Sequence, residues 1–205
     1  MSVSIRPFEA RDLESLFAIS LATGLAGSDA SRIYDDPRLM GQIYSAPYAL
    51  LDPGLALVVE DGQGVAGFAV GTIDTPSWER KLDEEWWPSL RRRYVDPTDT
   101  PEASRTPDQR RAFMIHHPTP APPAVSRKYP AHLHLNLLAR LQGHGVGSTL
   151  FEAWWALAQD RGAKALHVAV NRANARAIRF WTRQGFRELL LEGLPQGRTV
   201  WMGRD

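Results

Sequence analysis

The sequence predicts a single α/β domain. Segments in which apolar and polar residues alternate, as in strands, are interspersed with segments that carry apolar residues at helical spacing. The 205 residues, of which 43% are hydrophobic, suit one domain large enough to bury a core. A third observation is a glycine-rich turn that joins a strand directly to a helix within residues 131–161. We therefore expect one α/β domain organised around that central segment.

Composition excludes several classes of function. The net charge is +1, which gives no electrostatic case for nucleic acid or for an anionic membrane surface as a partner. No apolar run approaches the roughly 20 residues that span a bilayer. The absence of cysteine excludes disulfides, thiolate catalysis and cysteine-ligated metals. The first residues lack the layout of a secretion signal, so we expect a cytoplasmic protein.

The first third of the chain predicts strand, helix, helix, strand and strand. Asp12 is suited to open the first helix, and Gly24 to close it. Asp36 precedes Pro37, a pairing that commonly begins a helix. The turn at residues 61–64 contains two glycines between two apolar runs, which predicts a hairpin. The expected elements are a strand at 3–6, a helix at 12–24, a helix at about 36–44, and strands at 55–60 and 65–73.

Residues 74–129 separate this part from the next strand. Residues 77–94 are expected to form a helix, because Trp78, Leu82, Trp86 and Leu90 recur at intervals of four. The stretch 97–130 holds eight of the fifteen prolines, so we expect it to be largely extended or irregular, with a short helix at about 108–116. A segment of this length inside a compact domain is usually functional or disordered.

The central segment contains a strand, a turn and a helix. Residues 132–137 alternate between polar and apolar side chains, as a strand with two different faces does. A glycine-rich turn follows at 142–148. Apolar residues then recur at helical spacing up to Leu157, and Gly162 supplies the stop. A strand that passes through glycines into a helix start offers unpaired amide groups and a partial positive charge to an anion. This pattern predicts a site for pyrophosphate.

The last third predicts one more strand–helix unit and a closing hairpin. Residues 166–170 alternate as a strand does. Asn174 is suited to open a helix that ends at Gly185. The hairpin is expected to pair residues 189–192 with 199–202 through a turn at 194–197.

The spacing of the glycines separates three classes of phosphate site. A Walker-type loop requires a lysine before the helix, and here Gly147 is followed by Ser148. A dinucleotide fold requires G-x-G-x-x-G near the start of a βαβ unit, whereas here the glycines run G-x-G-x-G late in the chain. The pattern Gln/Arg-x-x-Gly-x-Gly/Ala fits Gln142, Gly145 and Gly147 without a gap. This resembles the acetyl-CoA-binding motif of the GNAT acetyltransferases. The alternative is a glycine-rich turn that binds no ligand.

A second motif supports the same resemblance. Asn174-x-x-Ala177-x-x-x-Trp181-x-x-x-Gly185-Phe186 is similar to N-x-x-A-x-x-x-Y-x-x-x-G-F of the same superfamily, and it follows the first motif in the expected order. The resemblance implies the GNAT fold over residues 1–205: a mixed, strongly twisted sheet of about six or seven strands with helices on both faces. Residues 74–129 would then be an insertion between the third and fourth strands. We interpret this insertion as a flap over the acceptor side; the alternative is a merely packed insertion.

A narrower likeness includes the insertion. Residues 72–94, 129–138, 179–186 and 192–195 resemble the acetyltransferase-like C-terminal domain of O-GlcNAcases and its free-standing bacterial relatives. Acetyl transfer by that domain of O-GlcNAcases is itself in doubt. The likeness therefore leaves two hypotheses open. One is an N-acetyltransferase that moves acetyl from acetyl-CoA to an amine by direct attack, and the other is a weak or inactive acetyl-CoA-binding pseudo-acetyltransferase that serves as a binding module.

The GNAT resemblance assigns the cofactor site. It implies that the backbone amides of Leu135 and Leu137 bond pantetheine and the acetyl oxygen, as preorganised donors do in acyl transfer. It also implies that residues 142–148 hold the pyrophosphate and that the Asn174 side chain reaches the pantetheine amides. The expected cofactor-binding residues are Leu135, Asn136, Leu137, Gln142, Gly143, His144, Gly145, Val146, Gly147, Ser148, Asn174, Ala177 and Trp181.

The proton-transfer groups follow from the chemistry of an amine attacking a thioester. An alkylammonium group with a pKa of about 10.4 must lose a proton before attack. His132, His134 and Asn136 share one face of the strand, and His134 is the candidate base; the alternative is a histidine with a structural role. Trp181 stands where the superfamily pattern has tyrosine, and an indole does not titrate. A thiol with a pKa of about 8.5 leaves with little help, so this departure slows the reaction without forbidding it.

His132 and His134 have the spacing to share a metal, but no third ligand is evident, so no metal is expected. The arginines at 172, 176, 179 and 183 form a stripe that either meets the CoA 3′-phosphate or is a solvated helix face. The amine acceptor is not specified by any motif; Tyr34, Tyr44, the two early helices and the insertion are expected to determine it.

Overall fold

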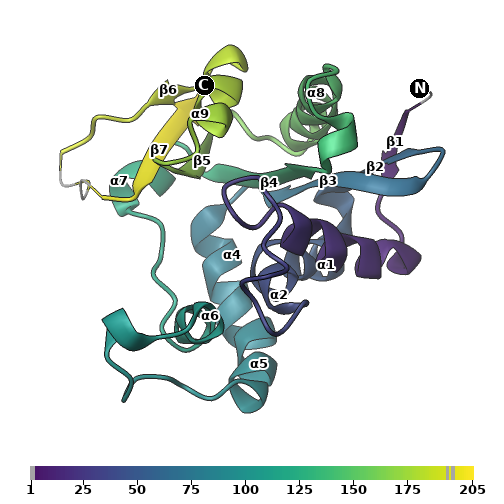
Figure 1. Ribbon diagram of the computed structural model, residues 1–205. Coiled ribbons are helices and arrows are strands. Elements are labelled where there is room, and N and C mark those ends of the chain that lie inside the picture. The colour runs from purple at the N-terminus through teal and green to yellow at the C-terminus, as the bar shows by residue number, and fades with distance from the viewer. Residues whose placement is uncertain (1–2, 193, 195–196) are drawn as a thin grey trace.

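The computed structural model describes residues 3–192, 194 and 197–205, and within them the chain forms one seven-stranded sheet (Figure 1). Its order is β1-β2-β3-β4-β5-β7-β6. β4 and β5 run parallel, and the other neighbouring strands run antiparallel, so the expected mixed sheet is confirmed. The strands are β1 Ser4–Pro7, β2 Ala56–Asp61, β3 Gly64–Thr72, β4 Ala131–Leu137, β5 Leu166–Asn171, β6 Arg187–Glu188 and β7 Thr199–Arg204.

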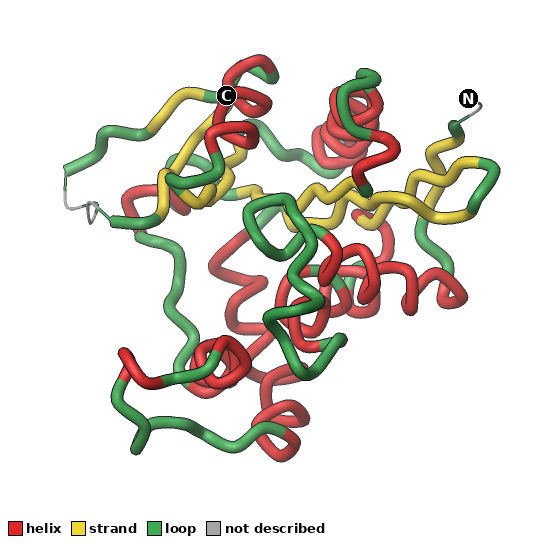
Figure 2. The backbone as a smooth tube through the Cα atoms, in the orientation of Figure 1, coloured by secondary structure: helices red, strands yellow, loops and turns green. Residues whose placement is uncertain are grey.

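Helices cover both faces of this sheet (Figure 2). α8 lies on one face, and α1, α2 and α4 lie on the other (Figure 1). The helices are α1 Leu13–Ala22, α2 Leu39–Tyr44, α3 Ala46–Leu51, α4 Thr75–Lys81, α5 Trp87–Arg93, α6 Pro107–His116, α7 Pro123–Ser126, α8 Val146–Asp160 and α9 Ala175–Arg183.

Each face of the sheet has its own hydrophobic core. On the α8 face, Leu57 and Val59 of β2 belong to a cluster with Phe151 and Trp154. On the opposite face, Val58 and its neighbours belong to a cluster with α1, α2 and the insertion. β2 and β3 are therefore apolar on both sides, as strands covered by helices on both faces are.

The second helix begins later than the sequence predicts. Asp36 does not cap it: its carboxylate accepts the amide of Arg38 within a turn, and α2 begins at Leu39. A further helix, α3, follows immediately and was not predicted. Ser45, with φ −141° and ψ −52°, breaks the helical path between α2 and α3.

The insertion contains the predicted helices with one shift in register. A π-helical turn, Leu82–Trp86, joins α4 to α5 and adds one residue to the helical repeat. The buried stripe after Leu82 therefore continues at Trp87 and not at Trp86. Trp86 instead donates its indole N–H to the Gln42 carbonyl oxygen at 2.9 Å. The short helix expected at 108–116 is confirmed as α6.

The closing hairpin differs from the prediction. The first strand is not at residues 189–192; β6 is Arg187–Glu188, paired with Gly203 and Met202 of β7. The leucine-rich run had favoured a strand, but Leu190 is 85% exposed, so this run supplies no buried strand face. The predicted turn at 194–197 includes residues 195–196, which lie outside the described residues.

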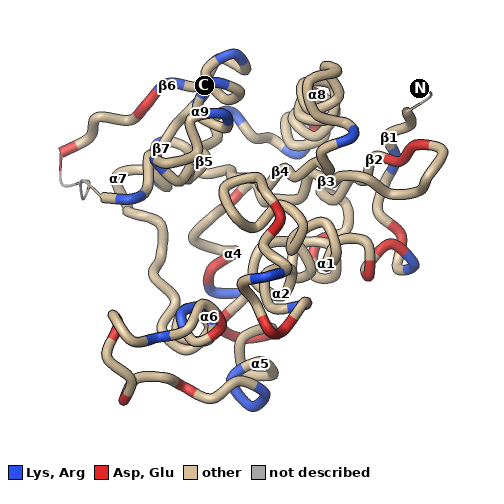
Figure 3. Tube along the Cα trace, viewed as in Figure 1, with Lys and Arg blue, Asp and Glu red and all other residues tan. Residues whose placement is uncertain are grey.

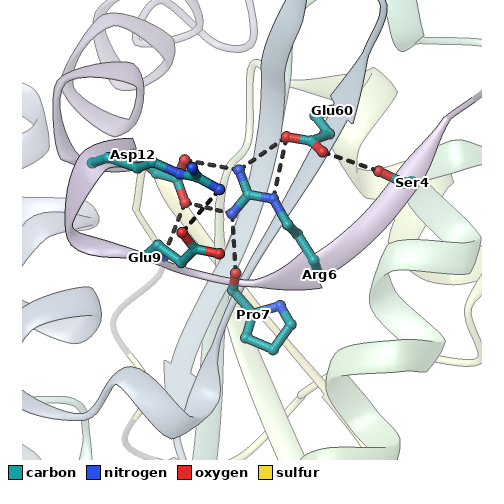
Figure 4. Close-up of polar contacts among 7 residues, drawn as sticks. Ser4, Arg6, Pro7, Glu9, Asp12 and Glu60 are labelled. Carbon is teal, nitrogen blue, oxygen red and sulfur yellow. Dashed lines mark hydrogen bonds and ion pairs between the residues drawn. The ribbon is translucent and has the colours of Figure 1, made fainter.

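A network of ion pairs joins β1 to Asp12, just before α1, and to β2 (Figure 4). The Arg6 guanidinium donates to both carboxylate oxygens of Asp12, at 2.7 and 2.9 Å, and to Glu60 of β2 at 2.9 Å. Asp12 is 3% exposed, and it also accepts the amide of Glu9 at 2.9 Å. The hydrogen bonds from Arg6 hold the pKa of the Asp12 carboxyl below its usual value.

Candidate functional site

The candidate site lies where β4 and β5 separate. Their parallel pairing covers Ala131 with Leu166 and His132 with His167, and then ends. The Ala131 amide donates toward β5, to the Ala165 carbonyl oxygen at 3.3 Å, whereas the Leu138 amide donates toward β3, to Ala66 at 2.8 Å. Because amide directions alternate along a strand, those of Leu135 and Leu137 are on the β5 side, beyond the last ladder pair.

The turn after β4 presents a row of amide groups. Gly143 and Gly145 both have φ of +80°, a conformation that favours glycine, and both are exposed. Within residues 142–148, the Gln142 and Ser148 amides donate to backbone carbonyls at 3.1 and 3.0 Å. The five amides of 143–147 have no hydrogen-bond partner among the residues that the structure describes. They lie at the start of the fifteen-residue helix α8, where the helix dipole also favours an anion.

Gln142 links this turn to the elements around it. Its Nε2 donates to the Leu137 carbonyl oxygen at 2.7 Å, and its Oε1 accepts from Arg176 Nη1 at 2.5 Å. Arg176 also donates from Nη2 to the Gly27 carbonyl oxygen at 3.3 Å. The strand end, α9 and the loop after α1 therefore meet beside the amide row. Arg176 was not singled out from the stripe of arginines, because spacing along a helix does not show which member meets another element.

Basic residues gather on α9, beside the amide row (Figure 3). α9 carries three arginines and no acidic residue, and it begins beside the amide row. Arg176, Arg179 and Arg183 are all exposed, although Arg176 has the two contacts just described. The local charge is thus compatible with a phosphate-bearing ligand.

The predicted residues of α9 are engaged in the helix itself. Asn174 accepts the Ala177 amide through Oδ1 at 3.0 Å and so caps the helix. Trp181 is 6% exposed and packs edge-to-face against Phe151 and Phe186, with ring centroids 5.6 and 4.9 Å apart. This burial leaves Trp181 little surface for a ligand.

The remaining predicted cofactor residues surround the amide row. The Ser148 hydroxyl accepts a hydrogen bond from the side-chain Nε2 of Gln184 at 2.9 Å, which connects the start of α8 to the end of α9. His144 is exposed, and Val146 packs partly buried against the core. Asn136 donates from its side chain to the Thr23 hydroxyl at 2.6 Å, at the end of α1.

The polar side chains of β4 lie on the face opposite α8. His134 is directly opposite Val70, and Asn136 opposite Phe68; both of these β3 residues belong to the core on the side of α1 and α2. His134 meets Tyr44 of α2 edge-on, with ring centroids 5.5 Å apart. β4 therefore presents the amides of Leu135 and Leu137 toward β5 and its histidines toward the early helices.

A hydrogen-bond chain assigns the tautomers of two histidines. Thr75 Oγ1 donates to the Pro130 carbonyl oxygen at 2.7 Å, so it accepts from Nδ1 of His132 at 2.6 Å. His132 Nε2 then carries a lone pair and accepts the Tyr48 hydroxyl proton at 2.7 Å. The Tyr48 oxygen in turn accepts the Nε2 proton of His134 at 3.3 Å. Nδ1 of His134 is left with a lone pair.

Burial keeps these histidines neutral. It lowers the pKa of His134 to about 4, and it also lowers the pKa of His132 and of His167. The same burial raises the pKa of the Tyr48 hydroxyl. At neutral pH the face therefore offers an uncharged imidazole that can accept a proton at Nδ1, although its low pKa makes it a weak base.

Tyr48 and Thr75 were missed as site residues. Tyr48 lies on α3, a helix that the sequence did not predict, and Thr75 is the first residue of α4. They are 84 and 57 residues from their partner His132, so no local pattern connects them to it.

Comparison with known proteins links this geometry to acetyl transfer. A family model described as the acetyltransferase (GNAT) family matches residues 112–186. The crystal structure of SsHAT is 34% identical, with a TM-score of 0.88 over the whole chain and 98% of that protein. The PaiA N-acetyltransferase of Thermoplasma acidophilum, solved in complex with coenzyme A, shares the fold at 15% identity, with a TM-score of 0.54 over the whole chain and 99% of that protein.

Curated relatives are more distant and much longer. Protein O-GlcNAcase of Rattus norvegicus and that of Mus musculus are 21% identical over 212 aligned residues, which cover 98% of this chain. The chain spans 22% of the length of these relatives. No helix within the described residues is long and apolar enough to cross a membrane. The same part of the chain holds no group of three side chains placed to ligate a metal.

Proposed function

The chain belongs to the GNAT family of acetyltransferases, and from that membership we propose that it binds acetyl-CoA and transfers the acetyl group to an amine by direct attack. The observation that carries the proposal is the row of five unpaired amides at 143–147, counted among the described residues, at the start of α8. The row directly follows the strand whose pairing with β5 has ended, so a cofactor bound there would extend toward Leu135 and Leu137.

Two parts of the cofactor would bind to backbone groups. The pyrophosphate would accept hydrogen bonds from the amides of 143–147 and be stabilised by the dipole of α8. Pantetheine and the acetyl oxygen would accept from the amides of Leu135 and Leu137. These amides are fixed in the strand before the reaction, so they stabilise the developing oxyanion without reorganisation. Asn136, Gln142, Ser148, Asn174 and Ala177 position these elements through the contacts described above.

The reaction would proceed in a ternary complex. The amine nitrogen attacks the thioester carbonyl carbon, a C–N bond forms, and the C–S bond breaks with its electron pair leaving on sulfur. The proton lost by the amine nitrogen would go to Nδ1 of His134. Trp181 supplies no proton to sulfur, but a thiolate with a conjugate-acid pKa of about 8.5 departs with little assistance.

Cofactor binding tests the first half of the proposal. We expect acetyl-CoA to bind in a calorimetric titration and NAD not to bind. Gly145→Glu places bulk and negative charge in the amide row and should abolish acetyl-CoA binding. Gly64→Glu is the matched control, because Gly64 also has a positive φ, of +102°, and also has nothing within 4 Å of its Cβ position among the described residues, but it lies in the β2–β3 hairpin. Undiminished binding by Gly145→Glu would contradict the assigned pyrophosphate site.

Turnover tests the second half. Thiol release from acetyl-CoA should rise when a suitable amine is added from a panel of amines, peptides and amino sugars. The buried Trp181 and the weakly basic His134 favour a second candidate, a CoA-binding module with little or no activity. Tight acetyl-CoA binding with no thiol release over the whole panel would select that candidate.

A further inference from the structure

Arg111 of α6 is a cation without an acidic partner among the described residues. It is partly buried. Its Nε donates to the Tyr34 hydroxyl at 3.1 Å, and its Nη1 lies 3.1 Å from the Met114 sulfur. The guanidinium carbon also lies 6.0 Å from the ring centroid of Tyr34 and 5.6 Å from that of Tyr44.

These contacts leave the charge incompletely compensated. A guanidinium has five N–H donors, and here one oxygen and one weakly accepting thioether meet them. Removing a charged group from water is costly unless it is paired. Arg140, by contrast, is paired with a carboxylate: it donates from Nε to Asp61 at 2.7 Å. The surroundings of Arg111 suit an anionic ligand that completes its hydrogen bonds.

Two carboxylates that contact neighbouring segments, those of Asp36 and Asp108, are already engaged. Asp36 accepts from Arg93 at 3.2 Å and from the Tyr94 hydroxyl at 2.7 Å. Asp108, one helical turn from Arg111, accepts the amides of residues 35 and 36 at 3.1 and 3.0 Å. Neither carboxylate is within salt-bridge distance of Arg111.

Arg111 is also close to the proposed proton acceptor. The Tyr44 ring centroid lies 5.6 Å from the guanidinium carbon and 5.5 Å from the His134 ring centroid. The cation and His134 therefore neighbour the same aromatic ring. This places Arg111 on the face of β4 that carries the histidines, away from the amide row at the start of α8.

We propose that Arg111 binds a carboxylate of the amine acceptor, so that the acceptor class is an amine that also carries a carboxylate. This inference rests on the proposed acetyl transfer. A planar guanidinium matches a carboxylate with two parallel hydrogen bonds, which explains an arginine at this position. The carboxylate can belong to a free amino acid or to an acidic side chain in a peptide. Tyr34 and Tyr44 hold the guanidinium in place for either source.

The test measures binding to the CoA-loaded protein by calorimetry. The probes are free N-acetyl amino acids, each paired with its carboxamide, and N-acetyl peptides with aspartate or glutamate, each paired with the asparagine or glutamine peptide. In at least one series we expect the carboxylate member to bind about 10- to 100-fold more tightly, the range of a charge-assisted hydrogen-bonded pair. Preference within the first or the second series identifies the source of the carboxylate.

Variants tie the preference to Arg111. Arg111→Gln should reduce the preference to less than twofold. Arg110→Gln, which removes the same charge from the exposed neighbouring position, should leave it unchanged. Arg111→Lys keeps the charge without the planar fork and should retain only a few-fold preference; it serves as the test if Arg111→Gln unfolds. Equal binding of both members of every pair, no binding by any probe, or a preference that survives Arg111→Gln would overturn the inference. Failure of acetyl-CoA binding, measured first without a probe, would instead count against the proposed function.

Discussion

His134 is distinguished from His132 by the use of its ring nitrogens. Both nitrogens of His132 are occupied, by Thr75 and by Tyr48, whereas Tyr48 contacts only Nε2 of His134. The chain of hydrogen bonds thus has a direction, from the Pro130 carbonyl outward to the lone pair on Nδ1 of His134. The Tyr48 hydroxyl contacts both histidines, so the tautomer of His132 determines that of His134.

Substitutions along this series of hydrogen bonds give the first prediction. His134→Ala should reduce kcat by about 10²- to 10⁴-fold, the usual contribution of a general base, with acetyl-CoA affinity unchanged. Tyr48→Phe should reduce kcat less, because the imidazole remains but its tautomer is no longer fixed. Steady-state kinetics and calorimetry check both variants, with His117→Ala as the control, because His117 is an exposed histidine outside the predicted site. Normal turnover by His134→Ala would remove this residue from the mechanism.

Acid sensitivity gives the second prediction. The folded-state pKa of His134, about 4, is below its ordinary value of 6.5, so the unfolded chain binds more protons between these values. The stabilisation is therefore fully present above pH 6.5 and is lost as the pH falls toward 4. We expect the contribution of His134 to the free energy of unfolding, measured in urea, to fall by about 2.5 kcal/mol between pH 7 and 4.5.

The slope against pH is the decisive quantity for this prediction. His134→Gln should reduce the slope between pH 4.5 and 6.5 relative to wild type, while His132 and His167, whose pKa is also lowered by burial, still contribute to it. Burial raises the pKa of Glu79, which acts in the opposite sense and is common to all the proteins compared. Parallel slopes for wild type and His134→Gln would show that His134 has an ordinary pKa.

At the level of elements, the sequence predicts the helices, strands and turns whose formation depends on neighbouring residues. The glycine turn, the alternation of β4 and the cap of α9 at Asn174 all depend on neighbouring residues, and each is where it was expected. The break at Ser45 and the π-helical turn at 82–86 depend on packing against other elements. The Trp86 indole, for example, bonds to the Gln42 carbonyl oxygen of α2. The relay through Tyr48 could not be predicted for the same reason, since it joins three elements far apart in sequence.

The attachment of β1 gives the third prediction. Arg6→Met leaves the Asp12 carboxylate 3% exposed and without its ion pair, and we expect a loss of about 3 kcal/mol in the free energy of unfolding. Arg11→Met is the control, because Arg11 pairs with Glu9 on the surface, with side chains 73% and 51% exposed, and should cost less than about 1 kcal/mol. Urea unfolding at pH 7 measures both. Equal losses would mean that the buried network does not hold β1.

At the scale of the whole molecule, the insertion forms part of one of the two cores. Trp78, Leu82, Trp87, Leu90 and Ile115 are all buried in the cluster that covers Val58, Phe68 and Val70 of the sheet. Its two ends meet across the β3–β4 ladder, where Thr72 lies opposite His132. Packing of this kind favours a structural role for helices α4 to α6, and the acceptor role that we propose is confined to Arg111 of α6.

Excision of the insertion gives the fourth prediction. Because its ends are adjacent, residues 74–130 can be replaced by a four-residue hairpin loop without moving β3 or β4. Each large apolar side chain that is removed contributes about 1.5–3 kcal/mol through burial, so five of them together are comparable to the whole stability of a typical domain. We expect the shortened protein to lose its near-ultraviolet circular dichroism and its cooperative unfolding transition.

A milder pair of substitutions separates this loss from damage at the new loop. Trp87→Ala should cost about 3–5 kcal/mol in the intact chain, since Trp87 is 6% exposed. Val95→Ala, at an insertion residue that is 87% exposed, should cost almost nothing. If the excised protein instead unfolds cooperatively and binds acetyl-CoA, the insertion is a flap laid over a complete domain. In that case the apolar face of β2 and β3 must be stable without the three tryptophans that now lie against it or beside it.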